Sequence, residues 1–84
     1  MPEIIIYSTQ VCPYCVKAKQ LLSAKGASFK DIDISRDPAL VIEAQNRSGG
    51  RKTVPQIFIG DLHVGGCDEL YALDAEGKLD GLLK

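Results

Sequence analysis

The sequence predicts an α/β domain in which a mixed four-stranded sheet is flanked by helices. Short β-branched, apolar segments alternate with segments of helical periodicity, in the order β-α-β-α-β-β-α. The first β-α-β unit is expected to form a right-handed parallel crossover. Only a short turn separates the last two strands, which is typical of an antiparallel hairpin. Parallel and antiparallel pairs are therefore expected in one sheet.

The first predicted strand, residues 3–8 (EIIIYS), has no regular alternation and is expected to be buried on both faces. A helix is predicted from residue 13 to residue 25. Pro13 suits its first position, where the amide that proline lacks has no partner, and Gly26 suits its end. Its sheet-facing residues are expected to be Cys15, Ala18 and Leu22.

Residues 28–34 (SFKDIDI) predict the second strand, because apolar and polar residues alternate there, although imperfectly. The pair Asp37 and Pro38 predicts the start of the second helix, with the aspartate as N-cap and the proline in the first turn. This helix is expected to continue to about Arg47. The segment Ser48-Gly49-Gly50 then ends it.

The third strand is predicted at residues 56–59 within the segment TVPQIFIG. A turn at Gly60 and Asp61 leads into a short strand at residues 62–64. A further helix is expected from residue 67 to residue 77. The closing segment LDGLLK is expected to form a brief apolar turn.

Length and composition predict one small domain over residues 1–84. The net charge is −1, with acidic and basic residues interspersed, unlike the basic surface of a nucleic-acid-binding protein. No apolar run is long enough to span a bilayer, and the N-terminal segment lacks the basic region of a signal peptide. We therefore expect a cytoplasmic protein that binds neither nucleic acid nor membrane.

The segment VCPYC places Cys12 and Cys15 where the first strand passes into the first helix. Unpaired N–H groups and the helix dipole favour a thiolate at Cys12. Cys15, one turn further on, is expected to be less exposed and closer to an ordinary thiol, yet within disulfide reach. Three cysteines are too few for a disulfide-stapled secreted scaffold. The pair therefore predicts an attacking thiolate and a resolving thiol.

A metal-holding module is the alternative hypothesis. The spacing C-x2-C…H-x3-C is one that zinc tolerates, and it is formed by Cys12, Cys15, His63 and Cys67. The proline and tyrosine inside the pair, and the strand before it, favour redox chemistry instead. His63 is expected to be a solvated residue of the hairpin.

Two further loops are candidate binding segments. Val54, before Pro55, is expected to be extended; a cis bond would present its N–H and C=O to an extended peptide, although the sequence alone favours a trans proline. In Gly65-Gly66-Cys67-Asp68, the N–H groups at a helix start suit a carboxylate, and the Asp68 carboxylate suits an ammonium group. An ordinary tight turn explains this second segment equally well.

CPYC after the first strand, TVP before the third and GGCD before the last long helix together resemble the glutaredoxins, and most closely the small bacterial dithiol glutaredoxins. The likeness covers essentially the whole chain. It implies a thioredoxin-like fold with sheet order 2-1-3-4 and a cis bond before Pro55, opposite the CxxC. It also implies that the ligand is glutathione.

The resemblance implies that Cys12 is the nucleophile and Cys15 the resolving cysteine of a glutathione-dependent thiol–disulfide oxidoreductase. Its substrates would be glutathionylated or disulfide-containing proteins. The implied glutathione-binding residues are Tyr14, Thr53, Val54, Pro55, Gly66, Cys67 and Asp68. Glutathione would be a co-substrate, with no permanently bound cofactor and no metal, and the protein is expected to be a monomer. A cluster shared by two protomers through the first cysteine and glutathione is the second form of the metal hypothesis.

The sequence departs from the family pattern at Thr9 and in the segment SGGRK. Thr9 stands where glutaredoxins commonly carry a lysine, three residues before the first cysteine. Lys17, Arg51 and Lys52 are candidates to compensate. Arg47, Arg51 and Lys52 gather near the third strand and could attract a second carboxylate, although a solvated basic loop is the expectation for these three. The segment SGGRK is one residue longer than usual. Cys67 adds a third thiol, either as a backbone position that happens to be cysteine or as a secondary oxidation site.

Overall fold

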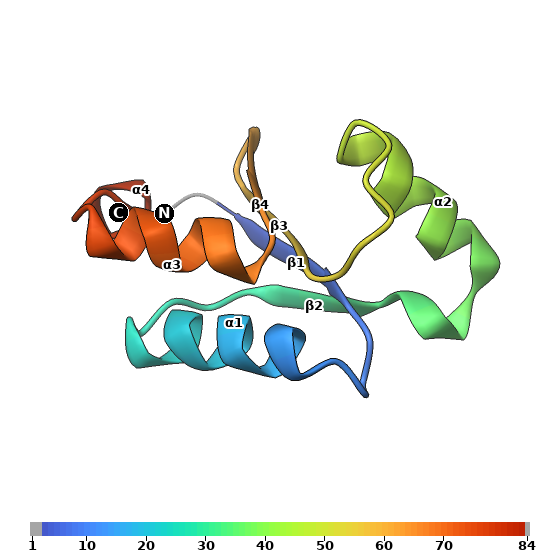
Figure 1. Cartoon of the computed structure of the whole chain (residues 1–84), viewed down its shortest axis with the longest axis horizontal. Coiled ribbons are helices and arrows are strands. Elements are labelled where there is room, and N and C mark those ends of the chain that lie inside the picture. Colours follow the sequence, from blue (N-terminus) through green and yellow to red (C-terminus); the bar gives the residue numbers. More distant parts are fainter. Residues whose placement is uncertain (1–2, 84) are drawn as a thin grey trace.

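The computed structural model describes residues 3–83 and contains a mixed four-stranded sheet with helices on both faces (Figure 1). In chain order the elements are β1 (Ile4–Ser8), α1 (Pro13–Ala24), β2 (Lys30–Asp33), the 3-10 turn η1 (Ile34–Arg36), α2 (Pro38–Arg47), β3 (Gln56–Ile59), β4 (Leu62–Gly65), α3 (Cys67–Ala75) and α4 (Leu79–Leu82). The strand order is β2-β1-β3-β4. Only β1 and β2 run parallel; the other two pairs are antiparallel. The predicted fold class and sheet order are confirmed.

The sheet separates two apolar cores because side chains alternate along its central strands. Ile6 and Ile57 point into the first core, which α1, α3 and α4 cover. Tyr7 and Phe58 point into the second core, beneath α2. Figure 1 shows α1 and α3 on one side of the sheet and α2 on the other. Burial on both faces explains why β1 and β3 read as continuous apolar runs.

The strand directions bring three loops to one end of the sheet. Tyr7, near the end of β1, pairs with Gln56, at the start of β3. Because β3 and β4 are also antiparallel, β4 ends at this same edge. The segments that lead into α1, β3 and α3 therefore meet there. This edge carries all three motifs that the sequence analysis identified.

Helix starts follow the predicted chemistry. Cys12 is the N-cap of α1, and Pro13 is the first helical residue. At α2, a side-chain oxygen of Asp37 accepts the Ala39 N–H at 2.9 Å, and Pro38 follows it in the first turn. The end of α2 at Arg47 is also as predicted.

Several element boundaries differ from the predictions. The strands β1 and β2 begin at Ile4 and Lys30 rather than at residues 3 and 28, α1 ends at Ala24 rather than at residue 25, and the closing segment forms the short helix α4. The second strand ends at Asp33, not Ile34, because the Asp33 carboxylate accepts the Ser35 N–H at 2.9 Å and turns the chain into η1. The fourth strand includes Gly65, one residue more than predicted. The helix α3 ends at Ala75, before Gly77 with its φ of +73°. Within the described residues, no helix is long and apolar enough to cross a membrane.

Candidate active site

The two cysteines of the CPYC segment lie in different surroundings. Cys12 is half-buried and caps α1, with its Sγ accepting the Cys15 N–H at 3.4 Å. The Cys15 side chain is fully buried, and both thiols are free. The Cys12 thiol also lies 3.8 Å from the carbonyl oxygen of Val54, to which it donates. One sulfur is thus accessible at a helix N-terminus, and the other is shielded behind it.

Cys15 is held as a neutral thiol. Burial raises the pKa of its thiol to about 12, and the neighbouring Cys12 acts in the same direction. A backbone hydrogen bond with Thr9 and the charge of Lys19 act in the opposite direction, but they offset only part of the rise. At neutral pH this thiol therefore stays protonated unless a change in its surroundings lowers its pKa.

The loop before β3 faces the Cys12 sulfur. The Val54–Pro55 peptide bond is cis, as the family resemblance implied and contrary to what the sequence alone favoured. The buried side chain of Gln56 supports the loop from behind, because its Nε2 donates to the carbonyl of Thr53 at 2.9 Å and to its hydroxyl at 3.2 Å. The main chain that faces the cysteine is therefore fixed by an internal hydrogen-bond network.

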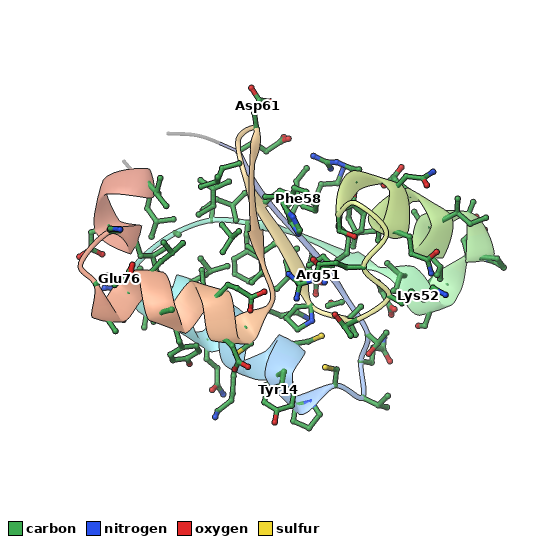
Figure 2. All side chains as sticks on the ribbon, turned by 45° about the horizontal axis from the view of Figure 1, so that its top comes forward. Tyr14, Arg51, Lys52, Phe58, Asp61 and Glu76 are labelled. Carbon is green, nitrogen blue, oxygen red and sulfur yellow. The ribbon has the colours of Figure 1, made fainter. Side chains whose placement is uncertain are left out.

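A cavity of about 220 Å³ lies next to Val54, whose carbonyl oxygen the Cys12 thiol contacts. All seven residues predicted to bind glutathione line it: Tyr14 at the start of α1, residues 53–55 before β3, and residues 66–68 at the start of α3. Arg51 and Glu69 line it as well. Figure 2 shows Tyr14 on α1 and Arg51 ahead of β3 near this end of the sheet. Tyr14 is more than half exposed, so its ring forms an open wall of the cavity.

An ion pair at the cavity was not predicted. Arg51 Nη1 donates to Glu69 Oε1 at 2.7 Å, and the same oxygen accepts the Gly66 N–H at 3.2 Å. The Arg51 guanidinium, followed by that backbone N–H, holds the pKa of the Glu69 carboxyl below its ordinary value. The glutamate three residues after the N-cap of α3 is a sequence signal that could have predicted the contact between Glu69 and the Gly66 N–H, but not the ion pair with Arg51. Arg51 is therefore fixed at the cavity and is not simply part of a solvated basic loop.

The other cations of the predicted basic loop have different positions. The Arg47 guanidinium donates to the Tyr7 hydroxyl at 2.8 Å and lies 4.4 Å from the centroid of the Phe58 ring. It therefore stabilises the second core and does not line the cavity. Lys52 is exposed, as expected for a loop lysine.

His63 is not the solvated hairpin residue that the sequence predicted. It is half-buried, its ring stacks on Phe58 with centroids 4.8 Å apart, and its Nε2 lies 2.7 Å from the side-chain oxygen of Gln56. Burial lowers the pKa of its imidazole. Among residues 3–83, no three His, Cys, Asp or Glu side chains are placed to hold a metal ion. The four-residue zinc set of the alternative hypothesis is therefore not assembled.

Cys67 begins α3, with its side chain buried in the first core. Burial raises the pKa of this thiol, and the neighbouring Asp68 carboxylate adds to the rise. Asp68 itself is exposed at the cavity. These positions make Cys67 a packing residue whose main chain borders the cavity.

Comparisons with known proteins agree with this geometry. The family model described as Glutaredoxin matches residues 4–64. Glutaredoxin 3 of Escherichia coli K12 is 56% identical over 84 residues and is covered completely, as is this chain. The solution structure of a glutaredoxin from Brucella melitensis has a TM-score of 0.88 and 62% identity, covering 100% of this chain and 90% of that one.

Two other solved structures are described by what they bind. The buckwheat glutaredoxin–glutathione complex has a TM-score of 0.89 and 30% identity, covering 98% of this chain and 76% of that one. A structure described as "Metal Binding of Glutaredoxins" has a TM-score of 0.76 and 61% identity, covering 100% of this chain and 90% of that one.

Proposed function

The chain belongs to the glutaredoxin family, and we propose that it is a dithiol enzyme that uses glutathione to reduce protein–glutathione mixed disulfides and protein disulfides. One observation carries the proposal: the Cys12 sulfur caps α1, with a second, buried thiol one turn away and a cavity bordered by Val54, which Cys12 contacts. We also propose that the enzyme is cytoplasmic, because a reducing compartment keeps such thiols free, and that it acts as a monomer.

The cavity offers complementary groups for glutathione, which is an extended peptide with two carboxylates and one ammonium group. We assign the γ-glutamyl carboxylate to the N–H groups at the start of α3, where the helix dipole favours an anion. Asp68 would meet the ammonium group, and the Val54 main chain would pair with the cysteinyl residue. Arg51 supplies a cation for the remaining carboxylate. The glutathione complex of the buckwheat relative supports glutathione as the ligand.

The reaction with a glutathionylated protein takes two exchanges. The Cys12 thiolate attacks the glutathione sulfur, the mixed disulfide breaks, and the protein thiolate leaves and takes a proton from solvent. A second glutathione, as thiolate, attacks the sulfur of the bound glutathione. Oxidised glutathione leaves, and Cys12 returns as a thiolate. The cavity bordered by Val54 would hold the glutathione that is common to both steps.

Protein disulfides require the second cysteine. After Cys12 has formed a mixed disulfide with the target, Cys15 attacks the Cys12 sulfur and releases the target thiol. The resulting Cys12–Cys15 bridge is then reduced by two glutathione molecules. The two free thiols of the reduced chain and their adjacency at the start of α1 support this route.

The test is a coupled assay that follows NADPH oxidation with either glutathione plus glutathione reductase or thioredoxin reductase as the electron source. We expect turnover of a glutathionylated protein with the glutathione system only, and none for Cys12→Ser. Cys15→Ser should retain that activity but lose most of the reduction of a protein disulfide. Turnover driven by thioredoxin reductase alone, or full activity of Cys12→Ser, would contradict the proposal.

A metal-holding role is the competing function, because a 61% identical structure is described by metal binding. The position of His63 removes the four-ligand zinc set, which leaves the cluster shared between two protomers. Anaerobically purified protein distinguishes the two functions by its absorption spectrum and by elemental analysis. We expect colourless protein without stoichiometric metal, whereas visible charge-transfer bands would favour the cluster.

A further inference from the structure

A polar network formed by Lys19 on α1, Asp31 on β2 and Ser8 on β1 has no part in the mechanism described so far. Lys19 Nζ lies 2.6 Å from one carboxylate oxygen of Asp31, and the buried hydroxyl of Ser8 donates to the other at 2.5 Å. The three side chains line a polar cleft of about 300 Å³ that shares no residue with the glutathione cavity. The Lys19 ammonium is therefore fixed in position between α1 and β2.

One member of this network lies on the same helix as the resolving cysteine. Lys19 follows Cys15 by four residues on α1, a spacing that places the two side chains on the same face of the helix, one turn apart. The backbone of Thr9, which follows Ser8, acts to lower the pKa of the Cys15 thiol, as Lys19 does. The buried thiol thus has a fixed cation on its own helix, one turn away.

The resolving step needs such help. Burial holds the pKa of Cys15 at about 12, so few molecules carry the required thiolate at neutral pH. An ionised Cys12 opposes the ionisation of this thiol, and Lys19 favours it. The Asp31 carboxylate that holds Lys19 offsets part of the effect of the ammonium group. Once Cys12 is bound in a mixed disulfide, its charge is gone. Lys19 then remains as the favourable charge.

We propose that Lys19, held by Asp31 and Ser8, is a positioning residue that promotes ionisation of Cys15 in the resolving step. Cys15 loses its proton to solvent and attacks the Cys12 sulfur. The Cys12–Cys15 bond forms, the bond from Cys12 to the target sulfur breaks, and the leaving thiolate takes up a proton. This role rests on the dithiol branch of the proposed function. Exchange between glutathione and Cys12 alone does not use it.

The test measures resolution without glutathione. Cys67→Ala protein, in which Cys12 and Cys15 are the only thiols, is mixed with the aromatic disulfide dithiobis(nitrobenzoate) in a stopped-flow instrument. A first release of coloured thiolate reports attack by Cys12, and a second reports attack by Cys15 on the mixed disulfide. Both rates are measured across pH for Lys19→Gln, Lys19→Arg and the matched control Lys78→Gln, which removes the same charge beyond the far end of α3.

For Lys19→Gln we expect the second phase to slow by about three- to tenfold, with its pH profile displaced by about 0.5–1 unit to higher pH. The first phase should change by less than about twofold. Lys19→Arg should restore the second phase, and Lys78→Gln should leave both phases unchanged. Circular dichroism and thermal unfolding establish that the variants are folded.

An unchanged second phase in Lys19→Gln, or equal slowing of both phases, would overturn the inference. Its failure is distinguishable from failure of the proposed function. Lys19-dependent resolution in a protein that glutathione does not reduce would retain the role of Lys19 and reject the glutathione enzyme. If glutathione does reduce the protein but the second phase does not depend on Lys19, the glutathione enzyme is retained and the role of Lys19 is rejected.

Discussion

At the scale of single residues, the two sulfurs differ because different main-chain groups face them. Cys12 Sγ accepts an N–H from Cys15 and donates to the Val54 carbonyl. Backbone groups at a helix start cannot be removed by a side-chain substitution. Thr9, in place of the lysine of the family pattern, therefore leaves these main-chain contacts unchanged.

Gly65 provides a residue-scale prediction. Its φ is +113°, and a Cβ at this position would lie 2.5 Å from Glu69 Oε1 and 2.9 Å from Arg51 Nη1. Gly65→Ala should lower the free energy of unfolding by about 1–3 kcal/mol and raise the KM for glutathione, because the Arg51–Glu69 pair must move. Denaturant unfolding and steady-state kinetics measure the two effects.

Gly49→Ala is the matched control, because Gly49 also has a positive φ, +73°, but an open space around its Cβ position. It should be destabilised through its backbone alone, by about 1–2 kcal/mol, with an unchanged KM. An equal rise in KM for both variants would show that the crowded contacts at Gly65 do not matter.

At the scale of elements, the start of α3 is fixed to the loop before β3. Glu69 joins the Gly66 N–H and Arg51 through one carboxylate oxygen, so residues 18 positions apart line one cavity wall. The side chains of the pair are each a little over 40% exposed, so the pair contributes little to stability. Its main effect is to hold the cation and the N–H groups in place for a ligand.

Glu69→Gln tests this interpretation. We expect the KM for glutathione to rise about threefold, while the free energy of unfolding at neutral pH falls by less than about 1 kcal/mol. Because the pKa of Glu69 is lowered in the folded protein, its contribution is present at neutral pH and is lost as pH falls through that lowered pKa. The difference in unfolding free energy between wild type and variant should therefore vanish in acid.

Glu76→Gln is the control for this experiment, since Glu76 pairs with exposed Lys78 beyond the other end of α3. Its KM should equal that of the wild type. A variant at Glu69 that binds glutathione normally would show that the ion pair does not organise the cavity.

At the scale of the whole molecule, the sheet order and strand directions bring the CPYC, TVP and GGCD segments together. Most of the fold could be predicted from the sequence, because buried strands and capped helices leave local patterns: the apolar run at residues 4–7 and the Asp37-Pro38 helix start are examples. The predicted cavity residues came from the resemblance of the CPYC, TVP and GGCD segments to the glutaredoxins.

What local patterns could not predict depends on contacts between distant residues. The Arg51–Glu69 and Arg47–Tyr7 contacts join side chains 18 and 40 positions apart, and neither leaves a periodic signal. The His63 ring is drawn from solvent by Phe58, its partner across the hairpin. In each case, contacts between distant residues determine whether the side chain is solvated or held in place. The prediction from sequence rested on the residue type alone.

The central claim is that the start of α1 activates the Cys12 sulfur, and its direct test is a measurement of reactivity. In a Cys15→Ser, Cys67→Ala variant, Cys12 is the only thiol, and the N–H group of residue 15 is retained. We predict that iodoacetamide alkylates this thiol at neutral pH about tenfold faster than it alkylates free glutathione. A rate equal to that of glutathione would contradict the account.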